Sequence, residues 1–291
     1  MLLCSACAPL HAQKDVGAIL PLTEPVRVAV IGDYGTGGEG ETEVVHALAE
    51  EHRIKPFQLG LTLGDDFYYC GVKSVNDKIW DTVWASYFDP LKIPFYATYG
   101  NHDYGRGGGP VCFGTRTNPK AEIAYTARSE TWRMPAAYYR FTAGPVEFLA
   151  LDTEKWGPSE REWVSRWLAR SPKGIHWRVV YGHRPIYSSG KHRGSVALQR
   201  QLLPLLEKAK VDVYLSGHDH DMEHLEAGSI QFFVAGGGGA STYGVANRDP
   251  HSIFAMQEHG FLELEADAET LSVRLVSSKG EVLGKPFVKT K

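Results

Sequence analysis

The 291-residue sequence has no long apolar run, which argues against a membrane-spanning segment. It also lacks a strong charge of one sign, because 34 acidic residues balance 31 Lys and Arg to a net charge of -3. That balance gives no electrostatic reason to expect nucleic acid or anionic lipid as a partner, so a small ligand is favoured. The sequence does not fix the oligomeric state, and we expect a monomer. No repeat and no Pro-, Ser- or charge-rich linker divides the chain, and we therefore expect one domain over residues 21–291.

Cysteine is scarce, with four residues in the whole chain. Cys4 and Cys7 lie near the start, which leaves Cys70 and Cys112 in the body of the protein, each just beyond a segment that we interpret below as a site loop. In an oxidising compartment these two could form a disulfide bond, and the alternative is a pair of buried free thiols. Spacing alone does not decide between them.

The first residues, MLLCSACAPLHAQ, are apolar and rich in small side chains, but they carry no Lys or Arg before Lys14. Small residues at Ala6, Ala8 and Ala12 are places where an export signal could be cut. We interpret residues 1–20 as a leader segment and predict a periplasmic or secreted protein. Cys7 also allows a degenerate lipidation site, and a floppy tail is the remaining alternative.

Short apolar runs that suit β-strands alternate with helical patterns in the first two thirds of the chain, which predicts parallel pairing with helices outside. Closely spaced strands near the C-terminus predict an antiparallel meander. Ser159 and Glu162 suggest a capping box, and Pro204 argues against one uninterrupted helix over 196–208. A mixed α/β layered sandwich follows. The expected helices are 41–52, 77–88, 159–170 and 196–208, and the expected strands are 26–31, 57–63, 93–99, 138–142, 146–151, 177–181, 211–215, 230–235, 261–265, 271–276 and 287–290.

Five of these strands end in short polar tags. Ligands of open α/β sheets bind in the crevice outside the carboxyl ends of the strands, so the tags are expected to converge. Any one of them has an ordinary explanation as a turn, a helix cap or a buried histidine, but all five follow apolar runs in one chain. The tags are Gly32–Gly35, Gly64–Tyr68, Gly100–Asp103, Gly182–Arg184 and Gly217–His220.

The side chains in the tags are those of metal ligands. Carboxylate, phenol and carboxamide oxygens suit hard cations, and imidazoles suit iron, zinc and manganese. His218 and His220 are two residues apart, so both can face one site from extended backbone. Seven or eight such groups exceed what one tetrahedral ion binds, which predicts two ions that share a bridging carboxylate.

The order and spacing of the tags resemble the calcineurin-like metallophosphoesterases. Tyr68, three residues after Asp65, narrows the resemblance to the purple acid phosphatases, and in particular to the small single-domain type of mammalian tartrate-resistant acid phosphatase. The likeness runs from about Val26 to Val276 and includes AEIAY at 121–125, WRMPAAYYR at 132–140 and VYGHRPIYS at 180–188. It implies a four-layer αββα sandwich in which two mixed β-sheets are flanked by helices.

The resemblance also implies a role for each tag residue. Asp33, Tyr68 and His220 would hold Fe(III), Asn101, His183 and His218 would hold a divalent iron, zinc or manganese, and Asp65 would bridge the two ions. Tyr68 as a phenolate would give the colour for which the family is named. Asp66 is not expected to be a ligand, and we interpret it as a loop-capping or solvent-facing residue.

The implied reaction is hydrolysis of small phosphomonoesters to inorganic phosphate, with a metal-bound hydroxide attacking phosphorus. His102 and His192 resemble family histidines that contact the phosphate and protonate the leaving group, although the match at His192 is looser. The stretch from Asp152 to Ser159 is too short for the protease-sensitive loop of the mammalian enzymes. Arg106, Lys191 and Arg193 could contact substrate, but solvated surface charge is the favoured interpretation for each.

Two alternatives remain open. One is another calcineurin-like enzyme that cleaves phosphodiesters or nucleotide pyrophosphates with manganese or zinc, in which Tyr68 would be structural and the protein colourless. The other, from a different class, is a non-catalytic iron-binding or scaffold protein that keeps the fold without turnover.

Overall fold

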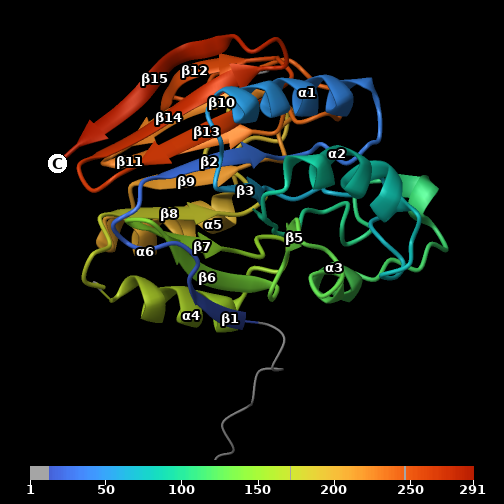
Figure 1. Ribbon diagram of the computed structural model, residues 1–291, viewed down its shortest axis with the longest axis horizontal. Helices are drawn as coiled ribbons and strands as arrows, with labels where there is room; N and C mark the ends of the chain where they lie inside the picture. Colours follow the sequence, from blue (N-terminus) through green and yellow to red (C-terminus); the bar gives the residue numbers. More distant parts are fainter. Residues whose placement is uncertain (1–12, 171, 246) are drawn as a thin grey trace, which may run out of the picture.

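The computed structural model describes residues 13–170, 172–245 and 247–291 (Figure 1). Two mixed β-sheets dominate these residues. In spatial order, the eight-stranded sheet contains β1 (Gln13–Ala18), β6 (Tyr138–Ala143), β7 (Val146–Ala150), β8 (Trp177–Tyr181), β9 (Val213–Ser216), β11 (Ile230–Ala235), β10 (Met222–Ala227) and β12 (Ser252–Met256). The seven-stranded sheet contains β15 (Val282–Thr290), β14 (Thr270–Ser277), β13 (Gly260–Ala266), β2 (Val26–Ile31), β3 (Leu59–Thr62), β4 (Phe95–Tyr96) and β5 (Trp132–Arg133).

Strand direction changes along both sheets. Strands β2, β3, β4 and β5 pair in parallel, whereas β13, β14 and β15 form the antiparallel meander that the C-terminal spacing predicted. In the other sheet β7, β8, β9 and β11 are parallel. The parallel strands therefore bring the ends of β2, β3, β4, β8 and β9 to the facing edges of the two sheets, where the polar tags begin.

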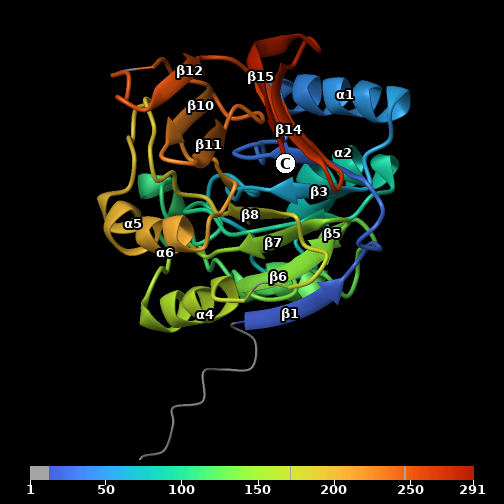
Figure 2. The ribbon, with the colours of Figure 1, turned by 90° about the vertical axis from the view of Figure 1, so that its left-hand side faces the viewer.

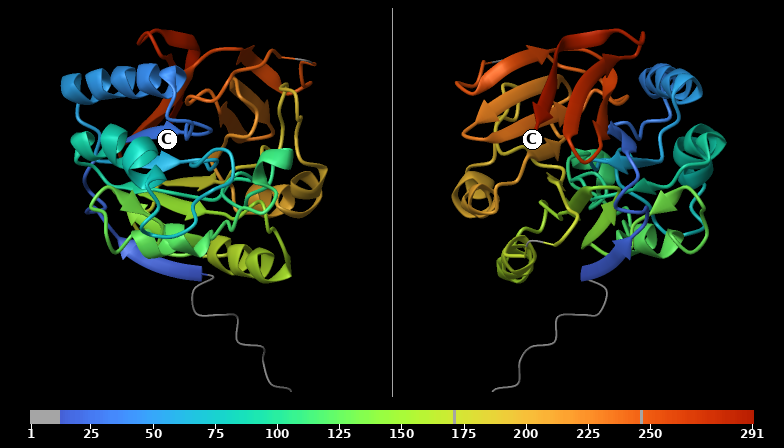
Figure 3. Two further views of the ribbon diagram at one scale, coloured as in Figure 1. Left: turned by 90° about the vertical axis from the view of Figure 1, so that its right-hand side faces the viewer. Right: turned by 60° about the vertical axis from the view of Figure 1, so that its left-hand side comes forward.

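Helices cover the outer face of each sheet, as Figure 2 and the two views of Figure 3 show. On the seven-stranded sheet lie α1 (Glu39–Ile54), the π-helical turn η1 (Trp80–Ala85), α2 (Ser86–Phe88), the 3₁₀ turn η2 (Asp89–Leu91) and α3 (Lys120–Tyr125), whereas the 3₁₀ turn η3 (Gly109–Cys112) has no buried residue. On the eight-stranded sheet lie α4 (Pro158–Leu168), α5 (Val196–Gln201) and α6 (Leu203–Lys208).

Three clusters of buried hydrophobic residues fill the spaces between four layers of helices and sheets. The largest joins both sheets, since it combines Val28 and Val30 of β2 with Phe141 and Phe148 of the other sheet. The alternate residues of β2 face the other way, and Ile31 packs with helix α1 in the second cluster. The third cluster joins the eight-stranded sheet to α4, α5 and α6. The predicted αββα sandwich is therefore confirmed.

Several local predictions are corrected. Helix α4 begins at Pro158 after Gly157, which makes no side-chain cap, so the predicted Ser159 capping box does not form. The chain expected to be one helix over 77–88 contains a π-helical turn. Pro204 has the expected effect, because α5 ends and α6 begins around Leu202. Strands β1, β5, β10 and β12 and helix α3 were not predicted.

The structure describes only part of the predicted leader segment. Residues 1–12 of the predicted leader lie outside the described residues. The rest of that leader contains Gln13–Ala18, which pairs in parallel with β6 as an edge strand. The boundary at residue 20 remains a prediction. Among the described residues, no helix combines the length and hydropathy needed to cross a bilayer.

The two body cysteines are joined. Cys70 and Cys112 form a disulfide bond with their Cα atoms 5.4 Å apart, so the bonded alternative holds and the free-thiol alternative is wrong. The bond ties the loop after β3 to the end of η3, just beyond the glycine-rich segment at 105–109.

Candidate metal centre

The polar tags turn sharply at the strand ends. Asp33, Asp65 and His218 have positive φ angles of 58, 54 and 70°. Left-handed backbone is uncommon for residues with a side chain, and such strain concentrates at functional sites. Two glycines let the loops approach: a Cβ on Gly100 would lie 2.2 Å from the backbone nitrogen of Asp65, and one on Gly217 would lie 2.2 Å from Asp33 Oδ2. Only glycine fits at either position.

One group of predicted ligands gathers around the Tyr68 hydroxyl. This oxygen lies 3.3 Å from Asp33 Oδ1, 3.3 Å from Asp65 Oδ2 and 3.0 Å from His220 Nε2. His220 Nε2 is in turn 3.5 Å from Asp33 Oδ1. The donors therefore converge from the ends of β2, β3 and β9, as the tags predicted.

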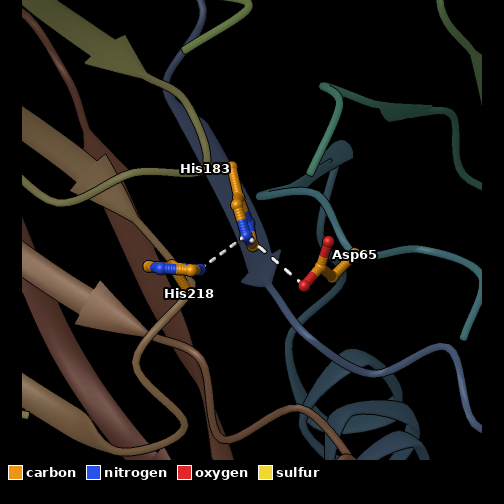
Figure 4. Close-up of side chains that lie close together, drawn as sticks. All are labelled: Asp65, His183 and His218. Carbon is orange, nitrogen blue, oxygen red and sulfur yellow. Dashed lines mark hydrogen bonds and ion pairs between the residues drawn. The ribbon is translucent and has the colours of Figure 1, made fainter. Parts of the chain in front are cut away.

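A second group surrounds His183, which follows β8. Its Nε2 atom lies 3.1 Å from His218 Nδ1 and 3.4 Å from Asp65 Oδ2 (Figure 4). The same atom lies 3.2 Å from Asn101 Oδ1. Atoms of Asp65, His183 and His218 lie within 4.8 Å of one another, all in buried side chains. Asp65 Oδ2 thus contacts both groups, which is the position required of a bridging carboxylate.

Backbone carbonyl groups orient two of the imidazoles. Nδ1 of His183 lies 2.9 Å from the carbonyl oxygen of Leu63, and Nδ1 of His220 lies 2.9 Å from that of Ser241. An N–H that donates to a carbonyl leaves the opposite nitrogen as a lone-pair donor. Nε2 of both histidines therefore points into the centre, as it would in a metal ligand.

The electrostatics of the centre favour a cation. Burial alone would lower the pKa of His183, but the charges of Asp65 and Asp33 outweigh it and raise this pKa to about 10. Burial raises the pKa of Tyr68, and Asp65 and Asp33 raise it further. Carboxylate, phenol, amide and imidazole donors with an affinity for positive charge are a donor set that fits two hard or borderline metal ions. Asp33, Asp65, Tyr68, Asn101, His183, His218 and His220 could hold them.

The two predicted catalytic histidines lie beside different predicted ligands. His102 is buried, its Nδ1 lies 2.7 Å from the carbonyl oxygen of Tyr69, and its Nε2 lies 3.9 Å from Asp65 Oδ2. His192 is exposed, and its ring centroid lies 4.6 Å from that of His218. The centroid of the His102 ring lies 4.2 Å from that of the Tyr68 ring, and His192 lines a cavity described below.

Asp103 is a functional residue that sequence reasoning missed, although it closes the third tag. Its Oδ2 accepts hydrogen bonds from the backbone N–H groups of Asp65 at 2.9 Å and Gly100 at 2.7 Å. Its Oδ1 accepts from Asp66 at 3.0 Å and Phe67 at 3.1 Å. One buried carboxylate therefore fixes two ligand-bearing loops to each other.

Asp66 is fully buried, so the expectation that it faces solvent is wrong. It forms a compact group of three buried acids with Asp103 and Glu122. Burial raises the pKa of Asp66 to about 8 and raises that of Glu122 well above its usual range. Burial also raises the pKa of Asp103, but the four N–H groups that face its oxygens need an acceptor there. Asp66 and Glu122 are the members that take up protons.

A cavity of about 360 Å³ opens beside the second ligand group. Its lining includes His192, Arg193, His218, Glu154 and Arg184. Neither Glu154 nor Arg184 received a role from the sequence, although Arg184 stands in the fourth tag. The sequence indicated them only through their positions, because each follows a strand that ends at the site.

Comparisons with known proteins agree with this geometry. The family described as calcineurin-like phosphoesterase matches residues 26–222. Purple acid phosphatase 7 of Arabidopsis thaliana is 30% identical over 81% of this chain and 77% of its own length. Human tartrate-resistant acid phosphatase type 5 is 28% identical over 75% of this chain and 74% of its own length.

Solved structures give the same fold. The structure of GAP50, the anchor in the inner membrane complex of Plasmodium, superimposes with a TM-score of 0.76 at 25% identity, covering 91% of this chain and 88% of its own. Purple acid phosphatase PPD1 from yellow lupin seeds superimposes with a TM-score of 0.70 at 20% identity, covering 92% of this chain and 54% of its own. The chain therefore belongs to the calcineurin-like phosphoesterases and, within them, to the purple acid phosphatases.

Proposed function

We propose that this protein is an acid phosphatase that hydrolyses phosphomonoesters at a dinuclear centre of Fe(III) and a divalent metal. The observation that carries the proposal is the contact between two donor groups through Asp65 Oδ2, which lies 3.3 Å from the Tyr68 hydroxyl and 3.4 Å from His183 Nε2. A single carboxylate between a phenol-containing group and a histidine-rich group suits two different ions. Tyr68, Asp33 and His220 are assigned to Fe(III), and Asn101, His183 and His218 to the divalent iron, zinc or manganese.

When bound, the two ions would supply an activated water and polarise the phosphate ester at mildly acidic pH. The side chains around them have separate tasks. His102 Nε2 lies beside Asp65, and because Nδ1 faces the Tyr69 carbonyl oxygen, the ring can donate a hydrogen bond from Nε2 to a phosphate oxygen when it is the doubly protonated imidazolium. His192 stands at the open side, where it can give a proton to the leaving alkoxide. Partial desolvation of the ring lowers the pKa of His192; the charge of Asp219 opposes this, and those of Lys191 and Arg184 lower the pKa further.

The non-catalytic alternative has a specific observation in its favour, which is the likeness to a protein described as an anchor. Glideosome-associated protein 50 of Plasmodium falciparum is 28% identical over 89% of this chain. A scaffold has no need to keep the ligands and the two histidines. Here all seven predicted ligands and His102 lie around one centre, which supports turnover over scaffolding.

The first experiment is a visible spectrum of the purified protein before and after mild reduction, together with metal analysis and turnover of p-nitrophenyl phosphate across pH. A violet band that shifts on one-electron reduction and disappears in Tyr68→Phe, with activity in acid, would support the proposal. A colourless protein with two manganese or zinc ions, active only on diesters or at alkaline pH, would refute the Fe(III) assignment. A metal-loaded protein with no turnover of either ester would favour the scaffold.

We further propose export to the periplasm or outside the cell. The disulfide bond between Cys70 and Cys112 supports this, because such bonds persist in oxidising compartments. Expression of the full chain, with fractionation and N-terminal sequencing of the product, tests it. Recovery of the uncut chain in the cytoplasmic fraction with free thiols would refute it.

A further inference from the structure

Arg184 lies directly after His183 and reaches across the front of the second ligand group. Its Nη1 is 2.6 Å from His218 Nε2, and its Nη2 is 3.4 Å from Asn101 Oδ1. The side chain is 33% exposed and lines the 360 Å³ cavity. The guanidinium therefore stands between the predicted ligands of the divalent ion and the space that a substrate would enter.

The chain holds Arg184 firmly in this place. Its N–H donates to Thr153 Oγ1 at 2.9 Å, and its carbonyl oxygen accepts a hydrogen bond from the Tyr214 hydroxyl at 2.7 Å. Glu154, whose side chain is only 4% exposed, pairs with Nε and lies 3.0 Å from Nη2. This fork-to-carboxylate pairing aims the outer edge of the guanidinium, which carries Nη1, at the cavity.

The contacts of Arg184 with His218 and Asn101 change if these residues bind a metal. With His218 Nδ1 as a ligand, the ring proton sits on Nε2, where it opposes the N–H of Nη1 that lies 2.6 Å away. With Asn101 Oδ1 as a ligand, one lone pair of this oxygen is taken up and its 3.4 Å contact with Nη2 weakens. The guanidinium then lies as a fixed positive charge beside a cation. Water could accept its N–H groups, but an anion in the cavity would accept them and also offset the charge.

We propose that Arg184 donates hydrogen bonds to the phosphate group of the substrate, and that Glu154 is the positioning residue that holds Arg184 in place. The inference rests on the proposed phosphatase function and extends it by one contact. A planar guanidinium matches two phosphate oxygens, which a lysine ammonium group does not. The negative charge of the phosphate also offsets the repulsion between Arg184 and the metal centre.

The test compares metal-loaded variants by calorimetric titration with inorganic phosphate and by turnover of p-nitrophenyl phosphate. In Arg184→Ala we expect the Kd of phosphate to rise about ten- to a hundredfold, the range of lost charge-assisted hydrogen bonds, and KM to rise with it. Arg184→Lys should recover part of the loss, because it keeps the charge but not the fork. Arg53→Ala is the matched control, because Arg53 also pairs with a carboxylate, Glu50, but on the exposed surface of α1.

Glu154→Gln separates positioning from direct contact. We expect a smaller rise in the Kd of phosphate than in Arg184→Ala, and no further rise when the two substitutions are combined, because both act through one guanidinium. Unchanged phosphate affinity in a folded Arg184→Ala protein that keeps both metals would overturn the proposal. Loss of metal from that variant, or full recovery in Arg184→Lys, would overturn it too. Failure of the proposed function would look different, since the wild-type protein itself would neither bind phosphate nor turn over the ester.

Discussion

Replacing Asp103 by Asn tests whether one buried carboxylate holds the metal-centre loops together. The wild-type side chain accepts four backbone hydrogen bonds, two on each oxygen, from Asp65, Asp66, Phe67 and Gly100. An Asn amide keeps one acceptor oxygen and places an NH₂ group where the other oxygen was. Whichever way it turns, the NH₂ group faces two backbone N–H groups, and both are left without an acceptor in a site that is 0% exposed.

The magnitude follows from the two orphaned donors. A buried donor without a partner lowers stability by about 1–3 kcal/mol, so Asp103→Asn should lower the free energy of unfolding by about 2–6 kcal/mol. Because Asp65 is one of the residues held, metal affinity should also fall, by about ten- to a hundredfold as for other residues that orient ligands. The first loss does not depend on metal, whereas the second does.

Urea unfolding followed by circular dichroism, with and without a chelator, measures the two losses separately. Asp267→Asn is a matched control, because Asp267 Oδ1 also accepts two backbone N–H groups, from Glu269 and Thr270, but in an exposed turn. Water can replace those bonds, so the control should change by less than about 1 kcal/mol. If Asp103→Asn unfolds within about 1 kcal/mol of the wild type in chelator, the carboxylate does not organise these loops and the reasoning is wrong.

Three further predictions follow from burial, loop closure and backbone fit. Burial raises the pKa of Glu41 to about 8, although hydrogen bonds from the backbone N–H groups of Gly37 and Thr36 oppose this shift. In the unfolded chain a glutamate has a pKa of about 4.3. The folded state therefore binds the extra proton between these values. As pH rises through that window, the contribution of Glu41 to the free energy of unfolding falls by up to about 1.4 kcal/mol per pH unit. Glu41→Gln should remove this contribution to the pH dependence of stability, measured by urea unfolding between pH 5 and 8. Replacing both Cys70 and Cys112 by Ser opens a cross-link with a sequence separation of 42 and should lower the free energy of unfolding by about 4 kcal/mol; an unchanged urea midpoint would contradict this. A Cβ on Gly107 would lie 2.5 Å from Asn101 Nδ2 and 2.8 Å from His102 Nε2, so Gly107→Ala should reduce turnover of p-nitrophenyl phosphate at least tenfold; Gly109→Ala, which also has a positive φ but open space around its Cβ, should not.

Much of the fold was predictable because apolar runs and strand ends carry strong local signals. β2 alternates between the inter-sheet cluster and the cluster under α1, and its hydrophobic pattern alone locates it. The predicted ligands could also be located from the sequence, since each follows such a strand. The short edge strand β1 was not, because Gln13–Ala18 has no apolar pattern and is fixed by pairing with β6, more than a hundred residues away.

What the sequence could not supply is the partner of each polar side chain. Asp103, Arg184 and Glu154 all stand beside predicted ligands or strand ends, yet a carboxylate or guanidinium in a loop has many possible partners. The carboxyl groups of Asp103 and the neighbouring Asp66 differ in their contacts: four backbone N–H groups donate to that of Asp103, whereas no backbone N–H of the described residues donates to that of Asp66. Residue type and position select the atoms that can bind a metal, but the paths of two loops determine which neighbouring charges hold them there. Asp103 and Arg184 make contacts with loops that follow several strands. Substitutions at these two residues therefore test the three-dimensional arrangement of the loops, which the sequence motifs alone do not specify.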